Sequence, residues 1–323
     1  MTTRPNTLEQ YYSLVLIGVG VVLALSSFAW LVMLARGGDR AFPRYGWWGL
    51  GACLALEAML ALRVPVVAAY FTALIWSAYI VAVDAAVFRR RGDSLLHHGS
   101  RFVAMASLSV VSWIIFEAYN LRLANWTYVG IPNEFWQLGL GSTWAFATIT
   151  PGILETAELV HAAWASKLRC RPWRPRGGGT IIAAGAACLA IPLIAPLSWA
   201  PYLFALVWAG FIFTLDPVHR MLGWPSLLAG LEQGEPGAAV ALLAAGGVCG
   251  FFWEFWNYWA TARWQYVFPI LHRYRIFAMP IPGFVGFPPF AIECYCLYIL
   301  LSRLLLPKRL RSCILSTCPD API

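Results

Sequence analysis

The sequence predicts an all-α, polytopic membrane protein of about nine transmembrane helices, with one N-terminal helix and two tandem four-helix repeats in parallel orientation. Three observations support this fold class. Hydrophobic residues make up 60% of the chain and charged residues only 12%, which excludes an ordinary soluble domain. Apolar windows of about 20 residues, the length of a spanning helix, recur along the chain. One set of polar and aromatic residues also occurs twice in the same order.

The apolar windows place the spans in order along the chain. The first follows a polar start and no clear small-residue cleavage site follows it, so we expect a retained helix. Pro192, Pro196 and Pro201 interrupt the sixth and seventh windows. The predicted spans are 12–35, 45–62, 66–87, 102–121, 140–164, 180–197, 200–215, 237–258 and 285–306.

The formal net charge of +8 reflects membrane topology. Most Lys and Arg residues fall in alternate loops, including Arg89–Arg91 and the linker 165–179, as the positive-inside rule describes. This pattern places the N-terminus outside and the C-terminus in the cytoplasm, and we expect a bacterial cytoplasmic (inner) membrane. The expected partner is the lipid bilayer rather than nucleic acid, and the oligomeric state is left open.

The eight cysteines show no metal-binding spacing. Five lie within predicted helices, where a free thiol behaves as a small hydrophobe. Cys170, Cys313 and Cys318 lie on the predicted cytoplasmic side, where disulfides are rare. We expect no cofactor and no metal.

The repeated residues keep nearly constant offsets, from 132 to 138 positions. Trp76 within Ala-Leu-Ile-Trp matches Trp208 within Ala-Leu-Val-Trp, and each precedes an aspartate by eight residues. Internal repeats of this kind indicate duplication. The first copy consists of Asp84, Glu117, Asn120, Trp126, Tyr128, Pro151 and Glu155, and the second of Asp216, Glu254, Asn257, Trp264, Tyr266, Pro289 and Glu293.

The repeat divides the chain into segments. An even number of helices in each unit keeps the two units in the same orientation, so matched residues are expected at the same depth. The predicted segments are an N-terminal helix and loop (1–44), the first repeat (45–164), a basic cytoplasmic linker (165–179), the second repeat (180–306) and a cytoplasmic tail (307–323).

The four repeated glutamates are the candidate catalytic residues. A carboxylate within a membrane is costly, so Glu117, Glu155, Glu254 and Glu293 form a functional-site hypothesis. We expect them to converge in the outer half of the bilayer, where one protonated acid donates a proton and an ionised neighbour accepts one. The prolines four residues before Glu155 and Glu293 are expected to bend the helix or free a carbonyl there. The alternative is a structural hydrogen-bonding role for each glutamate.

The residues around these acids are candidates for binding a hydrophobic substrate. Asn120 and Asn257 share a helix face with Glu117 and Glu254 through i, i+3 spacing. Aromatic rings would stabilise a developing carbocation through their π faces, although Trp and Tyr at this depth also form membrane-interface belts. For the aspartates at the helix ends, a capping or ion-pair role is favoured over chemistry. The candidate substrate-binding residues are Asn120, Trp126, Tyr128, Asn257, Trp264 and Tyr266.

A metal site is the competing reading of the acids. Glu158-x-x-His161 has the spacing of di-iron helix bundles, and Asp216-x-x-His219 offers a second such pair. Predicted depth argues against it, because the histidines approach the cytoplasmic side while Glu117 and Glu254 lie near the outer side.

The order of these motifs resembles that of the lycopene cyclase domain family, the small membrane-embedded carotenoid cyclases. The resemblance rests on an acid, a W-x-Y motif nine or ten residues later, and a proline followed by an acid, in both units. It implies a cofactor-independent, proton-initiated cyclisation of a polyene within the membrane. It further implies that acidic residues transfer the proton.

Three functions therefore remain open. The first is an acid–base enzyme acting on an isoprenoid or related lipid by cyclisation, hydration or isomerisation, with Glu254 and Glu293 foremost. The second is a proton-coupled carrier with a carboxylate-lined site between the repeats. The third is a structural or assembly protein. The segment 277–289, rich in Pro, Gly and Phe, has no good equivalent in the first unit and is either a re-entrant lid or an interfacial loop.

Overall fold

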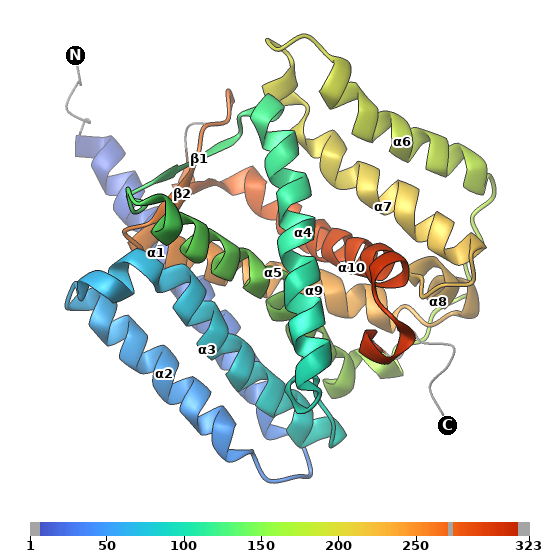
Figure 1. Ribbon diagram of the computed structural model, residues 1–323, viewed down its shortest axis with the longest axis horizontal. Helices are drawn as coiled ribbons and strands as arrows, with labels where there is room; N and C mark the ends of the chain where they lie inside the picture. The colour runs from blue at the N-terminus through green and yellow to red at the C-terminus, as the bar shows by residue number, and fades with distance from the viewer. Residues whose placement is uncertain (1–6, 271–273, 316–323) are drawn as a thin grey trace.

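The computed structural model describes residues 7–270 and 274–315, and within them the chain is almost entirely helical (Figure 1). Cys318 and the last part of the predicted tail 307–323 lie outside the described residues, as do residues 1–6. The α-helices are α1 (Thr7–Arg36), α2 (Arg44–Ala61), α3 (Pro65–Arg91), α4 (Gly99–Leu123), α5 (Phe135–Ala163), α6 (Gly178–Ile194), α7 (Phe204–Met221), α8 (Leu227–Gln233), α9 (Gly237–Trp259) and α10 (Phe287–Leu305).

Each predicted span coincides with one of these helices, and only the short α8 was not expected. Five stretches are long and apolar enough to cross a membrane: Tyr12–Arg36, Pro65–Arg91, Gly99–Leu123, Gly237–Trp259 and Ile281–Leu305. By length and composition, these helices are those of a membrane protein. The count of nine spans stays a prediction.

Two prolines of the second half precede or begin helices, whereas the sequence predicts Pro201 within a span and a bend at Pro289. The seventh helix begins at Phe204 rather than at residue 200, because Pro201 lies in a 3-10 turn, Ala200–Tyr202. Pro289 occupies the first turn of α10, where a missing N–H costs nothing, so it starts the helix instead of bending it. Pro151 does lie inside α5, as expected.

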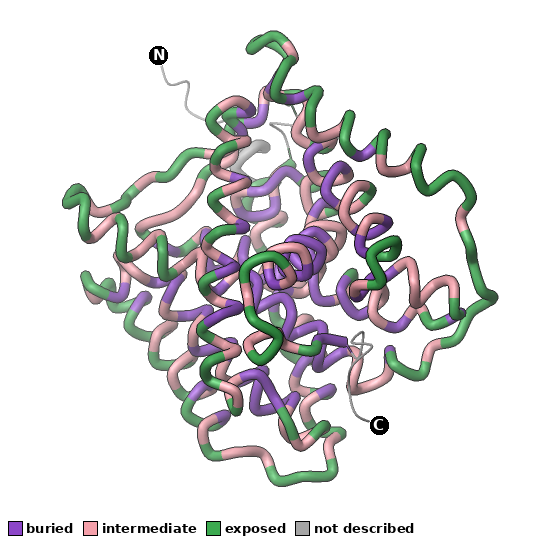
Figure 2. The backbone as a smooth tube through the Cα atoms, turned by 45° about the vertical axis from the view of Figure 1, so that its right-hand side comes forward, coloured by how far each residue is buried: buried purple, intermediate pink, exposed green. Residues whose placement is uncertain are grey.

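The core is built mainly by α3, α5, α9 and α10. Figure 2 shows the buried residues concentrated in the middle of the molecule. In α3 and α9 56% of the residues in the most apolar window are buried, whereas α1 buries only 17%. Small residues allow the central helices to approach closely. A Cβ at Gly246 of α9 would lie 2.3 Å from the Phe287 carbonyl oxygen at the start of α10.

Four short strands complete the described fold. Strands β3 (Arg275–Ile276) and β4 (Met279–Pro280) form one antiparallel pair. Strand β1 (Trp126–Val129) follows α4, strand β2 (Arg263–Tyr266) follows α9, and these two also pair antiparallel. The β1–β2 register places Trp126 opposite Tyr266 and Tyr128 opposite Trp264. The two W-x-Y motifs of the sequence thus meet as reciprocal cross-strand partners.

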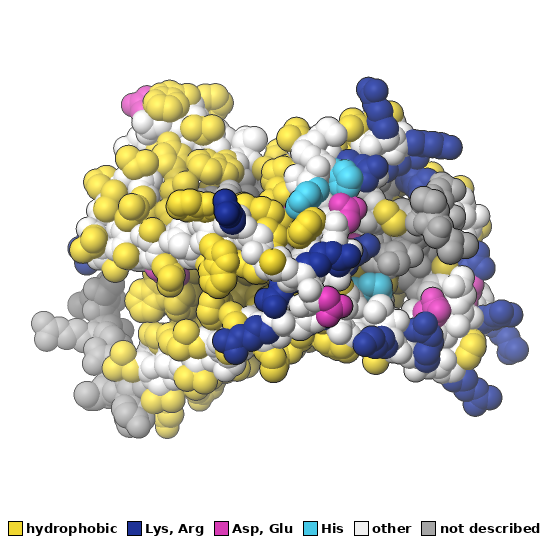
Figure 3. Space-filling view, turned by 90° about the horizontal axis from the view of Figure 1, so that it is seen from below, with side chains coloured by type: hydrophobic (Ala, Val, Ile, Leu, Met, Phe, Trp, Pro, Cys, Tyr) yellow, Lys and Arg dark blue, Asp and Glu magenta, His cyan; other side chains and the backbone are white. Residues whose placement is uncertain are grey.

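Charge is distributed unevenly over the molecule. Figure 3 shows Lys and Arg gathered toward one end of the lower face, with hydrophobic side chains covering the other end. Arg89–Arg91 form the last turn of α3, and Lys167–Arg176 follow α5. Strands β1 and β2 follow α4 and α9. The orientation of the chain in a membrane stays a prediction.

Candidate functional site

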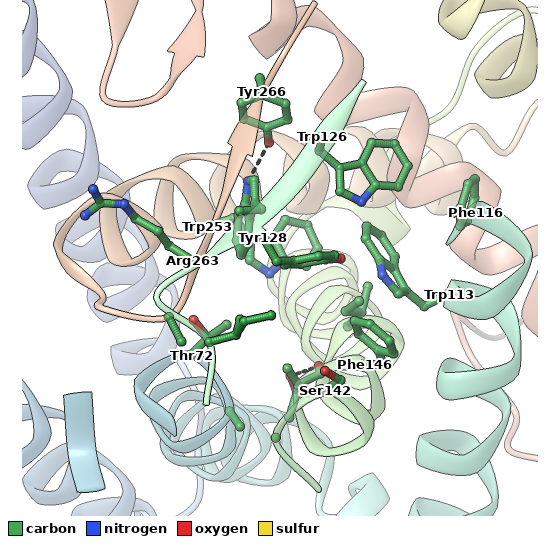
Figure 4. Close-up of a pocket in the computed structure, with 18 of the residues that line it drawn as sticks. Thr72, Trp113, Phe116, Trp126, Tyr128, Ser142, Phe146, Trp253, Arg263 and Tyr266 are labelled. Carbon is green, nitrogen blue, oxygen red and sulfur yellow. Dashed lines mark hydrogen bonds between the residues drawn. The ribbon is translucent and has the colours of Figure 1, made fainter. Parts of the chain in front are cut away.

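An aromatic cavity of about 200 Å³ lies between the two halves of the chain (Figure 4). Helices α3, α4, α5, α7, α9 and α10 and strands β1 and β2 all contribute to its wall. Cavities of this kind, mostly apolar with a few polar groups, typically bind hydrophobic ligands. Aromatic wall residues from both halves include Trp76, Trp113, Phe116, Trp126, Tyr128, Trp208, Trp253, Trp264, Tyr266, Phe287 and Phe290.

Glu117 stands behind one side of this wall and gathers three aromatic donors. The Trp113 and Trp126 indole N–H groups donate to its Oε1 atom at 2.8 and 3.1 Å. The Tyr128 hydroxyl donates to the same oxygen at 2.5 Å. Trp113 lies four residues before Glu117 on α4, so helical spacing puts both on one face. Since the donors line the cavity, the carboxylate contacts it through Tyr128 and the two indoles.

Glu254 forms a matching arrangement on α9. The Tyr266 hydroxyl donates to Glu254 Oε1 at 2.7 Å, and the Trp264 indole N–H donates to the Tyr266 oxygen at 2.9 Å. Tyr266 is labelled in Figure 4. Glu254 is fully buried, and its Oε2 atom has no hydrogen-bond partner among the described residues. Each half of the chain therefore supplies one glutamate–tyrosine pair to the same cavity.

The two pairs differ in their tryptophans: Trp126 donates to Glu117 itself, whereas Trp264 donates to Tyr266. Gly250 stands where the repeat would place the counterpart of Trp113, four residues before the glutamate. A Cβ at Gly250 would lie 2.3 Å from the Phe287 ring. Glu254 therefore lacks the indole donor that Trp113 provides to Glu117. The glycine instead leaves space for the Phe287 ring, which lines the cavity.

Burial and charge hold the tyrosines in their neutral form. Desolvation first, and the neighbouring Glu117 carboxylate second, raise the pKa of Tyr128 above its ordinary value. Desolvation followed by Glu254 raises the pKa of Tyr266 in the same way. Both hydroxyls therefore keep their protons at neutral pH and remain available as hydrogen-bond donors.

The two asparagines hold the strands rather than face the cavity. Asn120 Oδ1 accepts from the backbone N–H of Asn125 and Trp126, and its Nδ2 donates to the Trp126 carbonyl. Asn257 repeats this clasp on Trp264, with bonds of 3.0 Å in both directions. Neither asparagine is a lining residue, so their predicted substrate contact is replaced by a positioning role for the W-x-Y strands.

The expected convergence of four glutamates is not seen. Glu155 lines a separate cavity near the basic end of the molecule, together with Arg91 and Glu158. Glu293 is fully buried in α10, and neither of its oxygens has a partner among the described residues. Neither residue lines the aromatic cavity. Both lie farther along their helices than the lining residues do: Glu155 is two turns beyond Thr148 on the same face of α5, and Glu293 is one turn beyond Phe290 on α10.

The aspartates cap helices, as the sequence favoured. Asp84 accepts from the Leu96 backbone N–H at 2.9 Å and from the Tyr45 hydroxyl at 2.8 Å. Asp216 accepts from the backbone N–H groups of Leu227 and Leu228, both at 2.8 Å. These bonds fix the turns that follow α3 and α7 and satisfy orphan donors at the next helix start.

Several lining residues were not among the sequence candidates. Trp76 and Trp208 belong to the repeated Ala-Leu-x-Trp motif, which we used only to align the units, and both line the cavity. Their recurrence was the signal that would have found them. Arg263 is the one charged residue among the described lining residues. Its guanidinium donates to the Tyr258 and Ala260 carbonyls at the end of α9 and points away from the cavity centre (Figure 4).

Part of the predicted lid also lines the cavity. Met279 in β4, together with Gly286 and Phe287 at the start of α10, contributes to the wall. A Cβ at Gly286 would lie 1.8 Å from the Trp208 ring, so the chain passes directly over that indole. The segment therefore covers the cavity from the side of the second half.

Metal-ligating residues are dispersed. Among the described residues, no group of three or more His, Cys, Asp or Glu side chains is placed to hold a metal ion. Glu158, part of the di-iron spacing, instead pairs with Arg91. Asp216 is committed to its cap.

No family model matches the chain, and no curated protein or solved structure matches it. The site is therefore interpreted from its own geometry.

Proposed function

We propose that the chain is an integral membrane acid–base enzyme that acts on an isoprenoid or related hydrophobic lipid. One observation carries the proposal: two tyrosine hydroxyls, each bonded to a glutamate, belong to the wall of one aromatic cavity. An apolar wall suits a lipid chain, and paired acids supply the proton donor and acceptor that cyclisation, hydration or isomerisation requires.

The two pairs take opposite roles in one turnover. In the donating pair, the glutamic acid proton moves to the tyrosine oxygen while the tyrosine proton moves to a carbon of the substrate double bond. A carboxylate and a carbocation result, and the surrounding π faces stabilise the cation. The accepting pair then removes a proton from a neighbouring carbon, and the C–H electron pair forms a new double bond.

The residues have distinct roles in this proposal. Tyr128 and Tyr266 contact the substrate, while Glu117 and Glu254 exchange protons through them. Trp126 and Trp264 contact the substrate; the indole of Trp126 also bonds Glu117, and that of Trp264 bonds the Tyr266 hydroxyl. The two asparagines position the strands. Glu155 and Glu293, which do not line the cavity, take no direct part.

The proposal includes the tandem-repeat architecture, nine spans, and a bacterial inner-membrane location with the N-terminus outside. The reciprocal β1–β2 register and the matched asparagine clasps support a two-fold relation between the halves. The resemblance to the lycopene cyclase domain family supports the same reaction class, since its acid and W-x-Y motifs, though not its proline-and-acid motif, coincide with the residues that form the two pairs.

Lipid analysis of expressing cells tests this function. We expect a new lipid species in cells with the wild-type protein, and a fall of about 10²–10⁴-fold in its rate of formation for Tyr266→Phe or Tyr128→Phe. Tyr274→Phe, which alters an exposed tyrosine away from the cavity, serves as the matched control. Identical mass spectra with and without the protein would contradict an enzyme and favour a carrier or a structural protein.

A further inference from the structure

A second cavity of about 120 Å³ lies near the basic end of the molecule and shares no lining residue with the aromatic cavity. It borders the first turns of α4, whereas β1 follows the opposite end of that helix. This volume has room for several water molecules. Its lining consists of Val87, Arg91, Asp93, Ser94, Leu95, His98, Arg101, Met105, Leu154, Glu155, Glu158, Ser312, Cys313 and Ile314.

Two of the three acids in this cavity already have basic side chains as partners. Glu158 Oε2 is bonded to the Arg91 guanidinium, and Asp93 lies 3.0 Å from the His98 ring nitrogen. Glu155 has no such partner. It is 4% exposed, and its Oε2 atom has no hydrogen-bond donor among the described residues.

Glu293 provides an internal comparison for Glu155. Both follow a proline by four residues in matched parts of the sequence, and both are at least nine-tenths buried. Only Glu155 lines a polar cavity, because Glu293 lines neither of the two. A buried carboxylate without a donor is costly unless it binds a proton or a cation or contacts water. The cavity gives Glu155 that contact.

The C-terminal segment Ser312–Leu315 closes this cavity from one side. Ile314 and Leu315 are 4% and 2% exposed. The Leu315 backbone N–H donates to Glu158 Oε1 at 2.5 Å, and the Ser312 backbone N–H donates to the Tyr298 hydroxyl at 3.0 Å. Hydrogen bonds from Ser312 and Leu315 thus anchor both ends of the segment that borders the cavity of Glu155.

We propose that this cavity is a proton-exchange site at which Glu155 takes up and releases protons with water on the basic side, with Ser312–Leu315 limiting access. A hydronium ion gives its proton to a Glu155 oxygen and leaves as water, and release reverses the step. The site goes beyond the proposed enzyme function and does not depend on it. Charged and titratable groups around Glu155 are Asp84 and Arg91 on α3, Tyr45 on α2, Asp93, His98, Arg101, Glu158 and Cys313.

Carbodiimide labelling of the full-length protein in lipid nanodiscs, read by peptide mass spectrometry, tests this proposal. Carbodiimides react with protonated carboxyl groups. We expect a water-soluble carbodiimide to modify Glu155 but not Glu293, and the rate at Glu155 to fall about tenfold per pH unit above its titration midpoint. No adduct at Glu155, or equal labelling of Glu293, would overturn the site. This comparison within one protein needs no variant.

Two variants extend the test. Glu155→Gln, which keeps the size of the side chain, should remove the adduct. Ile314→Ala, which thins the cover, should increase the labelling rate several-fold. An unchanged rate in Ile314→Ala would overturn the role of the C-terminal segment. Lipid turnover is not a readout here, so failure of the enzyme proposal and failure of this one are distinguishable.

Discussion

At the scale of single residues, the site depends on amides that never touch the cavity. Asn257 is fully buried and bonds both the N–H and the carbonyl of Trp264. By fixing Trp264 it also positions Tyr266, two residues farther along β2, whose hydroxyl donates to Glu254. Asn120 makes the corresponding bonds to the Trp126 backbone. It is only partly buried, so water can replace these bonds more easily.

Replacing Asn257 with Ala should therefore destabilise the protein more than the same change at Asn120. The buried Trp264 backbone groups lose their partners, which costs about 1–3 kcal/mol. Thermal unfolding in matched nanodiscs measures the difference. Equal melting temperatures for wild type and Asn257→Ala would contradict the clasp.

The tyrosines predict a dependence of stability on alkaline pH. Their pKa values are raised in the folded state, so their contribution is fully present below the ordinary value of about 10 and is lost as pH rises toward the folded pKa. The variant Tyr128→Phe/Tyr266→Phe should lose stability less steeply above that pH than wild type, as measured by chemical denaturation. Tyr274→Phe should keep the wild-type slope, and equal slopes for all three proteins would refute the assignment.

At the scale of elements, close helix approach at glycine shapes the second half. Gly246 brings α9 against the backbone of Phe287, and Gly250 receives the ring of the same residue. These contacts place the start of α10, and with it Phe290, in the cavity wall. The first half has a tryptophan at the position that matches Gly250, so the two halves enclose the cavity with different residues.

The substitution Gly246→Ala should separate α9 from α10, because the added Cβ meets a backbone oxygen that cannot move alone. We expect a loss of about 1–3 kcal/mol in unfolding free energy. Gly247→Ala is the matched control, since a Cβ there meets nothing within 4 Å, and it should be neutral or slightly stabilising. The same melting temperature for both variants would argue against the close approach.

At the scale of the whole molecule, the sequence predicted the helices better than which of their residues reach the same cavity. Hydropathy placed each apolar segment because burial in lipid requires a continuous run of apolar residues. The repeat placed Glu117, Glu254 and both W-x-Y motifs, which do lie around one cavity. It could not show that Glu155 faces a different cavity, since the sequence does not reveal that the aromatic cavity ends near Thr148, two turns before Glu155 on the same face of α5.

Some residues of the cavity wall could not be predicted from the sequence. Trp76, Trp208 and Phe290 reach it from three different helices, and only packing among those helices brings them together. The strand pair was missed because β1 and β2 are four residues each and lie 137 positions apart. Pairing so distant leaves no local pattern in the sequence. The clasps of Asn120 and Asn257 show why both asparagines recur in the repeat.

The central claim is that the aromatic cavity transfers protons to and from a lipid. The most direct measurement is incorporation of deuterium from heavy water into carbon positions of the lipid product, by mass spectrometry with the protein in nanodiscs supplied with lipid extract. We predict deuterium in the product with wild type and Tyr274→Phe, and its loss with Glu254→Gln or Tyr266→Phe. A wild-type protein that leaves every lipid free of deuterium at carbon would contradict the account.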